Sequence, residues 1–241
     1  MPVDSLNFFF LDSIPQTPPP TASILIFCIS LIDKLSHTAD TCSMLSPTKN
    51  LPAAYRLDRS IDLSKNPKLV IWLNVAALAL FFLLGYLYLR LLAWIRPDAS
   101  LSLGNSGWLV SLAALLAVYI GVIVLHEIIH GLFFWIITGE RPQFGFRGAY
   151  AFAAAPDWYL PRPSYLVVGL APLVLITLVG LLLLPITPDG GLILLGLAIT
   201  ANASGAIGDL AVVAWLGWRY PASILVCDHG DAIDIFHPEQ T

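Results

Sequence analysis

The chain has 241 residues, of which 57% are hydrophobic and only 12% are charged, whereas an average soluble protein has about 25% charged residues. This composition excludes an ordinary soluble domain and predicts an integral membrane protein. The net charge is −4 and there is no run of lysines or arginines, so nucleic acid is not an expected partner. The three widely spaced cysteines predict neither a disulfide framework nor a zinc ribbon.

Residues 1–43 differ in composition from the rest of the chain. They contain a proline-rich stretch and a short apolar piece, residues 24–32, that is too brief to span a bilayer. No basic residue precedes that piece, which argues against a cleaved signal peptide. We expect residues 1–43 to be a disordered extension or foreign to the native protein, with Met44 as the true start. Residues 44–241 are expected to form one membrane-embedded domain.

Four apolar stretches are long enough to cross a bilayer as helices, so the expected fold class is an all-α membrane protein. They cover about residues 69–92, 107–137, 165–186 and 192–218. Basic residues precede the first stretch and lie between the second and third, whereas the loop between the third and fourth has none. By the positive-inside rule, both termini, including the tail 219–241, are expected to be cytoplasmic, and the expected location is the cell membrane.

The loop between the second and third stretches places aromatic residues at even spacing, namely Phe144, Phe146, Tyr150 and Phe152. A period of two is typical of strands, and Gly145 and Gly148 permit a bend, so a short β-hairpin is expected near the membrane surface. The alternative is an aromatic belt at the membrane interface, where such residues gather in any case. An exposed edge of a hairpin would accept an extended peptide by strand addition.

The second stretch contains His126-Glu-Ile-Ile-His130 in an otherwise uncharged apolar run. Ionisable groups at membrane depth are costly unless they are paired or bound to a metal, so their presence indicates function. Histidines at positions i and i+4 share one helix face, and a glutamate beside them serves as the base in zinc peptidases with the HExxH motif. The motif predicts His126 and His130 as zinc ligands and Glu127 as the catalytic base.

A catalytic zinc site usually has three protein ligands. Asp209 is the only acidic residue besides Glu127 within the four stretches, and we expect it to be the third ligand. His130 lies seven residues before the end of its stretch and Asp209 nine before residue 218, so both side chains lie at a similar depth. The alternative is that Asp209 is paired with another buried polar group.

Three residues near Asp209 can assist the site. Gly205 and Gly208 would allow close helix approach or local unwinding of the helix. Asn202 lies seven residues before Asp209, on nearly the same helix face, and is expected to orient a ligand or to hold the substrate carbonyl. The alternative for Asn202 is a hydrogen bond that joins two helices without a role in the site.

Six motifs in order carry a resemblance to a known family. They are the HExxH segment 126–134, the aromatic loop 144–152, the return 155–162, Gly-Leu-Ala-Pro at 169–172, the segment 202–209 and Asp-His-Gly-Asp at 228–231. Through them the chain resembles the zincin peptidase family of prokaryotic multi-pass membrane proteins, related to site-2 protease-type intramembrane zinc metalloproteases.

This resemblance implies zinc at His126, His130 and Asp209, a catalytic Glu127, and a peptide bond in or near the membrane as the substrate. One departure concerns the third ligand. Site-2 proteases have Asn-Pro and Asp-Gly pairs around it, whereas in this chain no proline follows Asn202 and the glycine precedes Asp209. The departure weakens any transfer of the details of substrate handling.

The expected function is therefore that of a membrane-embedded zinc metallopeptidase, in which zinc activates a water and Glu127 is the general base. The alternative is a non-catalytic metal-binding membrane protein, such as a sensor, transporter or scaffold. A transporter would need further polar groups along the helices, and the four stretches contain few. The expected partners are the lipid bilayer and a membrane-protein or peptide substrate.

The tail has acidic and histidine residues between 228 and 237 that resemble a second metal site. Short acidic stretches are usually solvated, and the alternating residues 232–236 are also typical of a small terminal strand. We therefore do not predict a second metal in the tail.

Overall fold

The computed structural model describes residues 46–62, 65–102, 107–146, 151–230 and 232–239. The expected extension 1–43 lies outside the described residues, as do Gly148 and Tyr150 of the aromatic loop and Asp231 of the tail. The chain divides into two units, Met1–Met44 and Leu45–Thr241. All of the described helices and strands belong to the second unit.

The second unit contains five described helices. They are α2 (Pro67–Ile95), α3 (Trp108–Thr138), α4 (Arg162–Leu183), α5 (Asp189–Gly205) and α6 (Ile207–Arg219). Helices α2, α3 and α4 are each long and apolar enough to cross a membrane, and α5 with α6 makes a fourth candidate if the bent pair is one span. The four predicted stretches thus correspond to helices, with ends that differ by a few residues.

The fourth stretch is interrupted rather than straight. The axes of α5 and α6 differ by 41°, and the break lies at Ala206, whose N–H donates to the carbonyl of Asn202 at 3.0 Å. The span is thus bent between Gly205 and Gly208, while the i→i−4 hydrogen bond of Ala206 is kept. The close helix approach expected at Gly205 and Gly208 is not seen within the described residues, because a Cβ atom on either glycine would have no neighbour within 4 Å.

The expected all-α class is wrong, because five strands form an antiparallel sheet beside the helices. The strands are β1 (Tyr55–Asp62), β2 (Gln143–Phe146), β3 (Ala151–Pro161), β4 (Leu225–Asp228) and β5 (Ala232–Pro238), in the order β1-β5-β4-β3-β2. The expected hairpin is present, since β2 pairs antiparallel with β3 and Gly145 lies opposite Phe152. The strand considered for the tail is also present, as β5.

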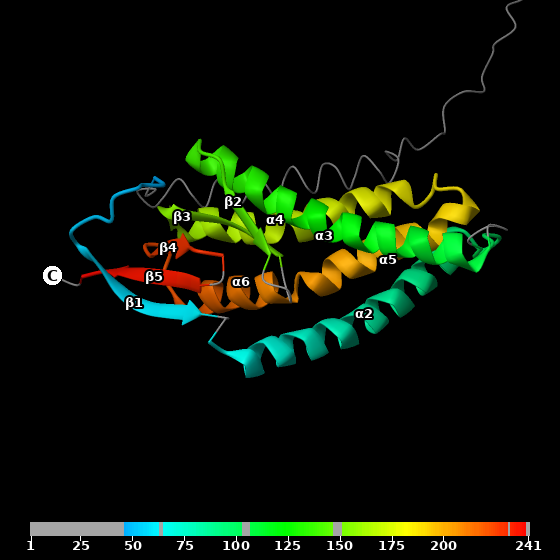
Figure 1. The fold of residues 1–241 in the computed structure, drawn as a ribbon, viewed down its shortest axis with the longest axis horizontal. Helices are drawn as coiled ribbons and strands as arrows, with labels where there is room; N and C mark the ends of the chain where they lie inside the picture. The colour runs from blue at the N-terminus through cyan, green and yellow to red at the C-terminus, as the bar shows by residue number, and fades with distance from the viewer. Residues whose placement is uncertain (1–45, 63–64, 103–106, 147–150, 231, 240–241) are drawn as a thin grey trace, which may run out of the picture. The chain divides into compact units, whose positions relative to one another are not determined.

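Strands β1, β5 and β4 lie at one end of the helices (Figure 1). At this end β3 leads directly into α4 at Arg162, and a short turn joins α6 to β4. A buried core fills the junction, with residues from helices α3, α4 and α6 and from three strands: Phe134, Leu160, Tyr165, Val168, Leu216, Val226 and Ile235. Through Phe134 of α3, which follows the HExxH motif, this core packs the end of α3 against α4, α6 and the sheet.

A second contact region joins α2 to α5. The Tyr88 ring packs on Gly196, where a Cβ atom would come within 2.4 Å of the ring, and the Tyr88 hydroxyl donates to the Leu192 carbonyl at 2.6 Å. After α2 ends, the Arg96 guanidinium pairs with Asp189 at the start of α5, with 2.6 Å between nitrogen and oxygen. These contacts hold α5, and with it Asn202, against the rest of the bundle.

Candidate metal centre

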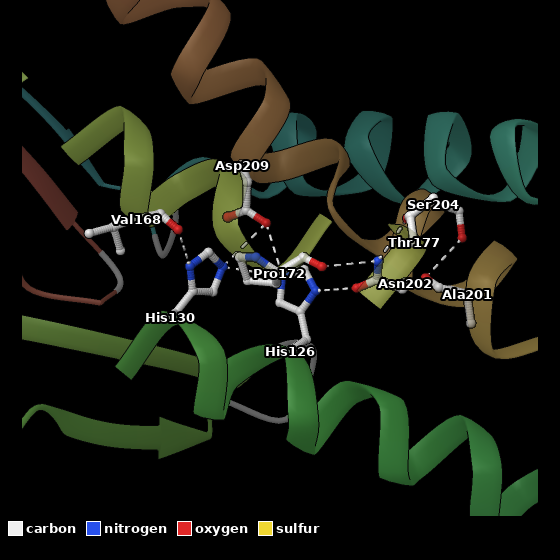
Figure 2. Close-up of polar contacts among 9 residues, drawn as sticks. All are labelled: His126, His130, Val168, Pro172, Thr177, Ala201, Asn202, Ser204 and Asp209. Atoms are coloured by element: carbon white, nitrogen blue, oxygen red, sulfur yellow. Dashed lines mark hydrogen bonds and ion pairs between the residues drawn. The ribbon is translucent and has the colours of Figure 1, made fainter. Parts of the chain in front are cut away.

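His126 and His130 lie one turn apart on α3 and point to the same side of the helix (Figure 2). Both side chains are buried, and their Nε2 atoms are 3.2 Å apart. This is the arrangement that the i, i+4 spacing predicts, because successive turns of an α-helix place such residues above one another.

Asp209 reaches the two histidines from α6. Its Oδ2 atom lies 3.1 Å from Nε2 of His126 and 3.5 Å from Nε2 of His130. Asp209 is in the first turn of α6, and this helix has its own N-terminus only because the span is broken at Ala206. A carboxylate is stabilised there by the partial positive charge of the helix end. The break therefore provides a favourable position for an anion among apolar helices.

The other nitrogen of each imidazole makes a hydrogen bond to a neighbouring helix (Figure 2). Nδ1 of His130 lies 2.9 Å from the carbonyl oxygen of Val168 in α4. Nδ1 of His126 lies 2.9 Å from Oδ1 of Asn202 in α5, and the amide nitrogen of Asn202 donates to the carbonyl of Pro172 at 3.3 Å. Both Nδ1 partners are oxygen acceptors, so a neutral imidazole that offers Nε2 to a metal carries its proton on Nδ1.

With the protons on Nδ1, the two Nε2 atoms and the Asp209 oxygen all present lone pairs to one another. Such a group is unfavourable without a cation between its members, and it matches the neutral imidazole and carboxylate donors that zinc prefers. Ligand atoms of a tetrahedral zinc site with bonds of about 2.0–2.1 Å lie about 3.3 Å apart. The three separations, 3.1, 3.2 and 3.5 Å, agree with that spacing.

Within the described residues, His126, His130 and Asp209 form the only group of three or more histidine, cysteine or acidic side chains that can hold a metal ion. The structure thus brings together the three residues expected as ligands and places the expected Asn202 behind one of them. The ion-pair partners of Asp209 among the described residues are the two histidines.

Glu127 is half-buried and lies beside this group. It is close enough to both histidines and to Asp209 for the charges to interact, and its carboxylate lies near the Ala153 backbone in β3. The hairpin also packs directly on α3, because Gly131 has no side chain and the Phe144 ring occupies that space. The site is therefore bordered by α4, α5 and α6 and by the β2–β3 hairpin.

Tail residue Asp228 belongs to the core between the sheet and α4. Asp228 is buried in β4, where its carboxylate accepts hydrogen bonds from the Tyr165 hydroxyl at 2.6 Å and from the Gly230 N–H at 2.7 Å. Burial raises the pKa of Asp228 above its usual value. His229 pairs with Asp234, with 3.1 Å between nitrogen and oxygen. Asp231 lies outside the described residues.

Sequence reasoning missed the groups in α4 that support the histidines. The Val168 carbonyl belongs to the backbone and has no side-chain signature. Pro172 and Thr177, which both accept hydrogen bonds from the Asn202 amide, lie in a long apolar run. The one available signal was a proline in the middle of a predicted span, because such a residue leaves a carbonyl without its usual helical partner.

Comparison with known proteins gives one result. Residues 119–225 match a family model that is described as "Putative zincin peptidase". The matched range contains the HExxH motif, the β2–β3 hairpin, α4 and Asp209. No curated protein and no solved structure matches the chain.

Proposed function

Residues 119–225 belong to the zincin peptidase family, and from this premise we propose that the protein is a membrane-embedded zinc metallopeptidase. Its substrate would be a peptide bond in or near the membrane. The observation that carries the proposal is the group of three lone-pair donors separated by 3.1–3.5 Å, with a glutamate beside it in the helix that supplies two of them.

The residues of the site have distinct parts in the proposed reaction. When bound, zinc supplies a water of lowered pKa and polarises the scissile carbonyl. Glu127 removes a proton from the water and later delivers it to the leaving amine, as a general base and then a general acid. The Ala153 backbone lies near the carboxylate of Glu127, and Asn202 and Val168 hold the two imidazoles in the orientation that presents Nε2.

The β2–β3 hairpin favours a substrate that binds in an extended conformation. β2 is the last strand of the described sheet, with β3 on one side only, and its partner β3 contacts Glu127. A peptide added to the free edge of β2 would run as a strand beside the site. The carbonyls of an intact helix are hydrogen-bonded within it, so a helical substrate must unwind before its peptide bond can react.

The proposal is tested by zinc content and peptide cleavage in purified, detergent-solubilised protein. Wild type should hold about one zinc per chain. His126→Ala and Asp209→Ala should lose it, because each removes one of three ligands. Glu127→Gln should keep zinc but cleave a quenched fluorogenic peptide library about 10²–10⁴-fold more slowly, because the amide cannot accept the proton.

Glu140→Gln is the matched control, since Glu140 lies just beyond the end of the same helix and is exposed, paired with Lys49 at 2.5 Å. It should bind zinc and cleave the library as wild type does. Cleavage by Glu127→Gln at the wild-type rate would contradict the assigned base. A wild type that binds zinc but cleaves nothing in the library would favour the sensor or scaffold function instead.

A further inference from the structure

Pro172 lies inside α4, one turn after Val168. In an α-helix the N–H of residue i donates to the carbonyl of residue i−4, and proline has no N–H to donate. The Val168 carbonyl is therefore without its usual helical donor. Val168 is only 2% exposed, and an unbonded carbonyl in an apolar region is strongly unfavourable.

A histidine of the metal centre supplies the hydrogen-bond donor that the Val168 carbonyl lacks. Nδ1 of His130 donates to the Val168 oxygen at 2.9 Å, in place of the absent N–H of Pro172. This bond requires the proton to be on Nδ1, and it turns Nε2 toward His126 and Asp209. Pro172 thus leaves the Val168 carbonyl free to accept a hydrogen bond, and His130 donates that bond.

The same proline also contributes to the second imidazole. Its carbonyl accepts a hydrogen bond from the amide nitrogen of Asn202 at 3.3 Å. The amide oxygen of Asn202 therefore faces Nδ1 of His126, 2.9 Å away. Pro172 and Asn202 are both almost fully buried, so no water competes for these groups. A chain of two hydrogen bonds therefore leads from the Pro172 carbonyl through Asn202 to His126. His130 bonds instead to the Val168 carbonyl that Pro172 leaves without a helical donor.

We propose that Pro172 is a positioning residue of the metal centre, because it releases the Val168 carbonyl to His130 and holds Asn202 against His126. Both imidazoles then present Nε2 to the ion without rearrangement. The inference rests on the metal-binding part of the proposed function and does not depend on proteolysis. A proline that only shapes α4 would fill the same place in the helix without affecting the affinity for metal.

The two roles predict opposite results for Pro172→Ala. Alanine is a far better helix former than proline and restores an N–H that competes with His130 for the Val168 carbonyl. We expect the metal-free protein to be as stable as wild type or more stable in thermal unfolding, while zinc affinity falls. Loss of a hydrogen-bond partner behind a metal ligand typically weakens binding about 10- to 100-fold.

Zinc affinity would be measured by competition with a chelator, and the geometry of the site by the visible absorption of the Co²⁺-loaded protein. Pro172→Ala and Pro172→Ser should both weaken binding and change the Co²⁺ spectrum, because each restores the N–H. Pro163→Ala is the matched control, since Pro163 is in the first turn of the same helix, where an N–H has no helical partner. It should match wild type in both measurements.

Wild-type affinity and spectrum in Pro172→Ala would overturn the inference. So would a loss of affinity that accompanies an equal loss of stability or failure to fold, since the role would then be structural. None of these readouts involves peptide cleavage, so a wild type that binds zinc without cleaving peptides leaves the inference standing. Failure of the wild type to bind zinc would overturn both this inference and the proposed function.

Discussion

A hydrogen bond between Tyr165 and Asp228 connects α4 to the sheet. Tyr165 lies one turn before Val168, whose carbonyl accepts the hydrogen bond from His130. Both residues are buried, and the hydroxyl of Tyr165 donates to the carboxylate of Asp228 at 2.6 Å. The carboxylate also receives the Gly230 N–H. The pair therefore fixes the start of α4 relative to β4, and with it the position of Val168.

Asp228→Ala should lower the free energy of unfolding by about 1–3 kcal/mol, because it leaves the buried Tyr165 hydroxyl and the partly buried Gly230 N–H without an acceptor. Asp228→Asn keeps an amide oxygen that can accept one hydrogen bond, so its loss should be smaller. Unfolding midpoints in denaturant, compared at equal detergent concentration, measure both. Equal stability of wild type and Asp228→Ala would show that this pair does not hold α4.

Individual residues of the site differed in how far they could be predicted. His126, Glu127, His130 and Asp209 were conspicuous because ionisable side chains are rare in apolar helices. The partners of the histidines were not, because Val168 and Pro172 contribute carbonyl groups that every residue has. Asp228 was assigned to a solvated tail, since its burial depends on contact with a helix 63 residues earlier in the chain.

At the scale of helices and strands, apolar length was a sufficient signal for the helices but not for the sheet. Strand β1 is mostly exposed and has charged residues at half of its positions, so it lacks the alternation that marks a half-buried strand. Strand β4 has four buried residues and is too short for any period to be visible. Both strands are stabilised by pairing with β5 at the end of the chain.

The packing of α4 against α6 determines whether Asp209 reaches the histidines. A Cβ atom on Gly169 would lie 2.8 Å from Cγ2 of Val213 in α6, which is too close for two carbon atoms. Since α6 carries Asp209 in its first turn, a displacement of α6 moves the third ligand away from α3. Gly169 thus permits the helix contact that the site requires.

Gly169→Ala should therefore weaken zinc binding, and the double variant Gly169→Ala/Val213→Ala should recover most of it, because the second change removes the opposing methyl group. Gly85→Ala is the control, since a Cβ atom there has no neighbour within 4 Å among the described residues. Chelator competition gives the three affinities. An unchanged affinity in the single variant, or no recovery in the double variant, would contradict this account of the packing.

In residues 45–241 taken as a whole, the two ends of the helices differ in charge. The sheet end has basic residues in β1, at the start of α4 and at the end of α6, such as Arg56, Arg162 and Arg219. At the other end, Arg96 is the one lysine or arginine in the described residues of the connections between α2 and α3 and between α4 and α5. This asymmetry supports the proposal that the sheet and the C-terminus are cytoplasmic.

Reporter fusions expressed in a bacterial inner membrane test this orientation. A green fluorescent protein fused after residue 241 should fluoresce, and alkaline phosphatase at the same place should be inactive, because the first needs the cytoplasm and the second the opposite side. Alkaline phosphatase inserted after Asp98, between α2 and α3, should be active. The reverse pattern would place the sheet outside the cell and refute the assigned orientation.

The pairing of β1 with β5 has a consequence for the order of events during synthesis. Register pairs join Tyr55 to Pro238 and Asp62 to Ala232, and β1 has no other neighbour in the described sheet. Strand β1 leaves the ribosome before every described helix, yet its hydrogen-bonding partner β5 follows all of these helices in the chain. The pairing of β1 with β5 therefore forms only after α6, the last described helix, has been synthesised. A chain terminated before β5 cannot hold α4 and α6 as the complete sheet does.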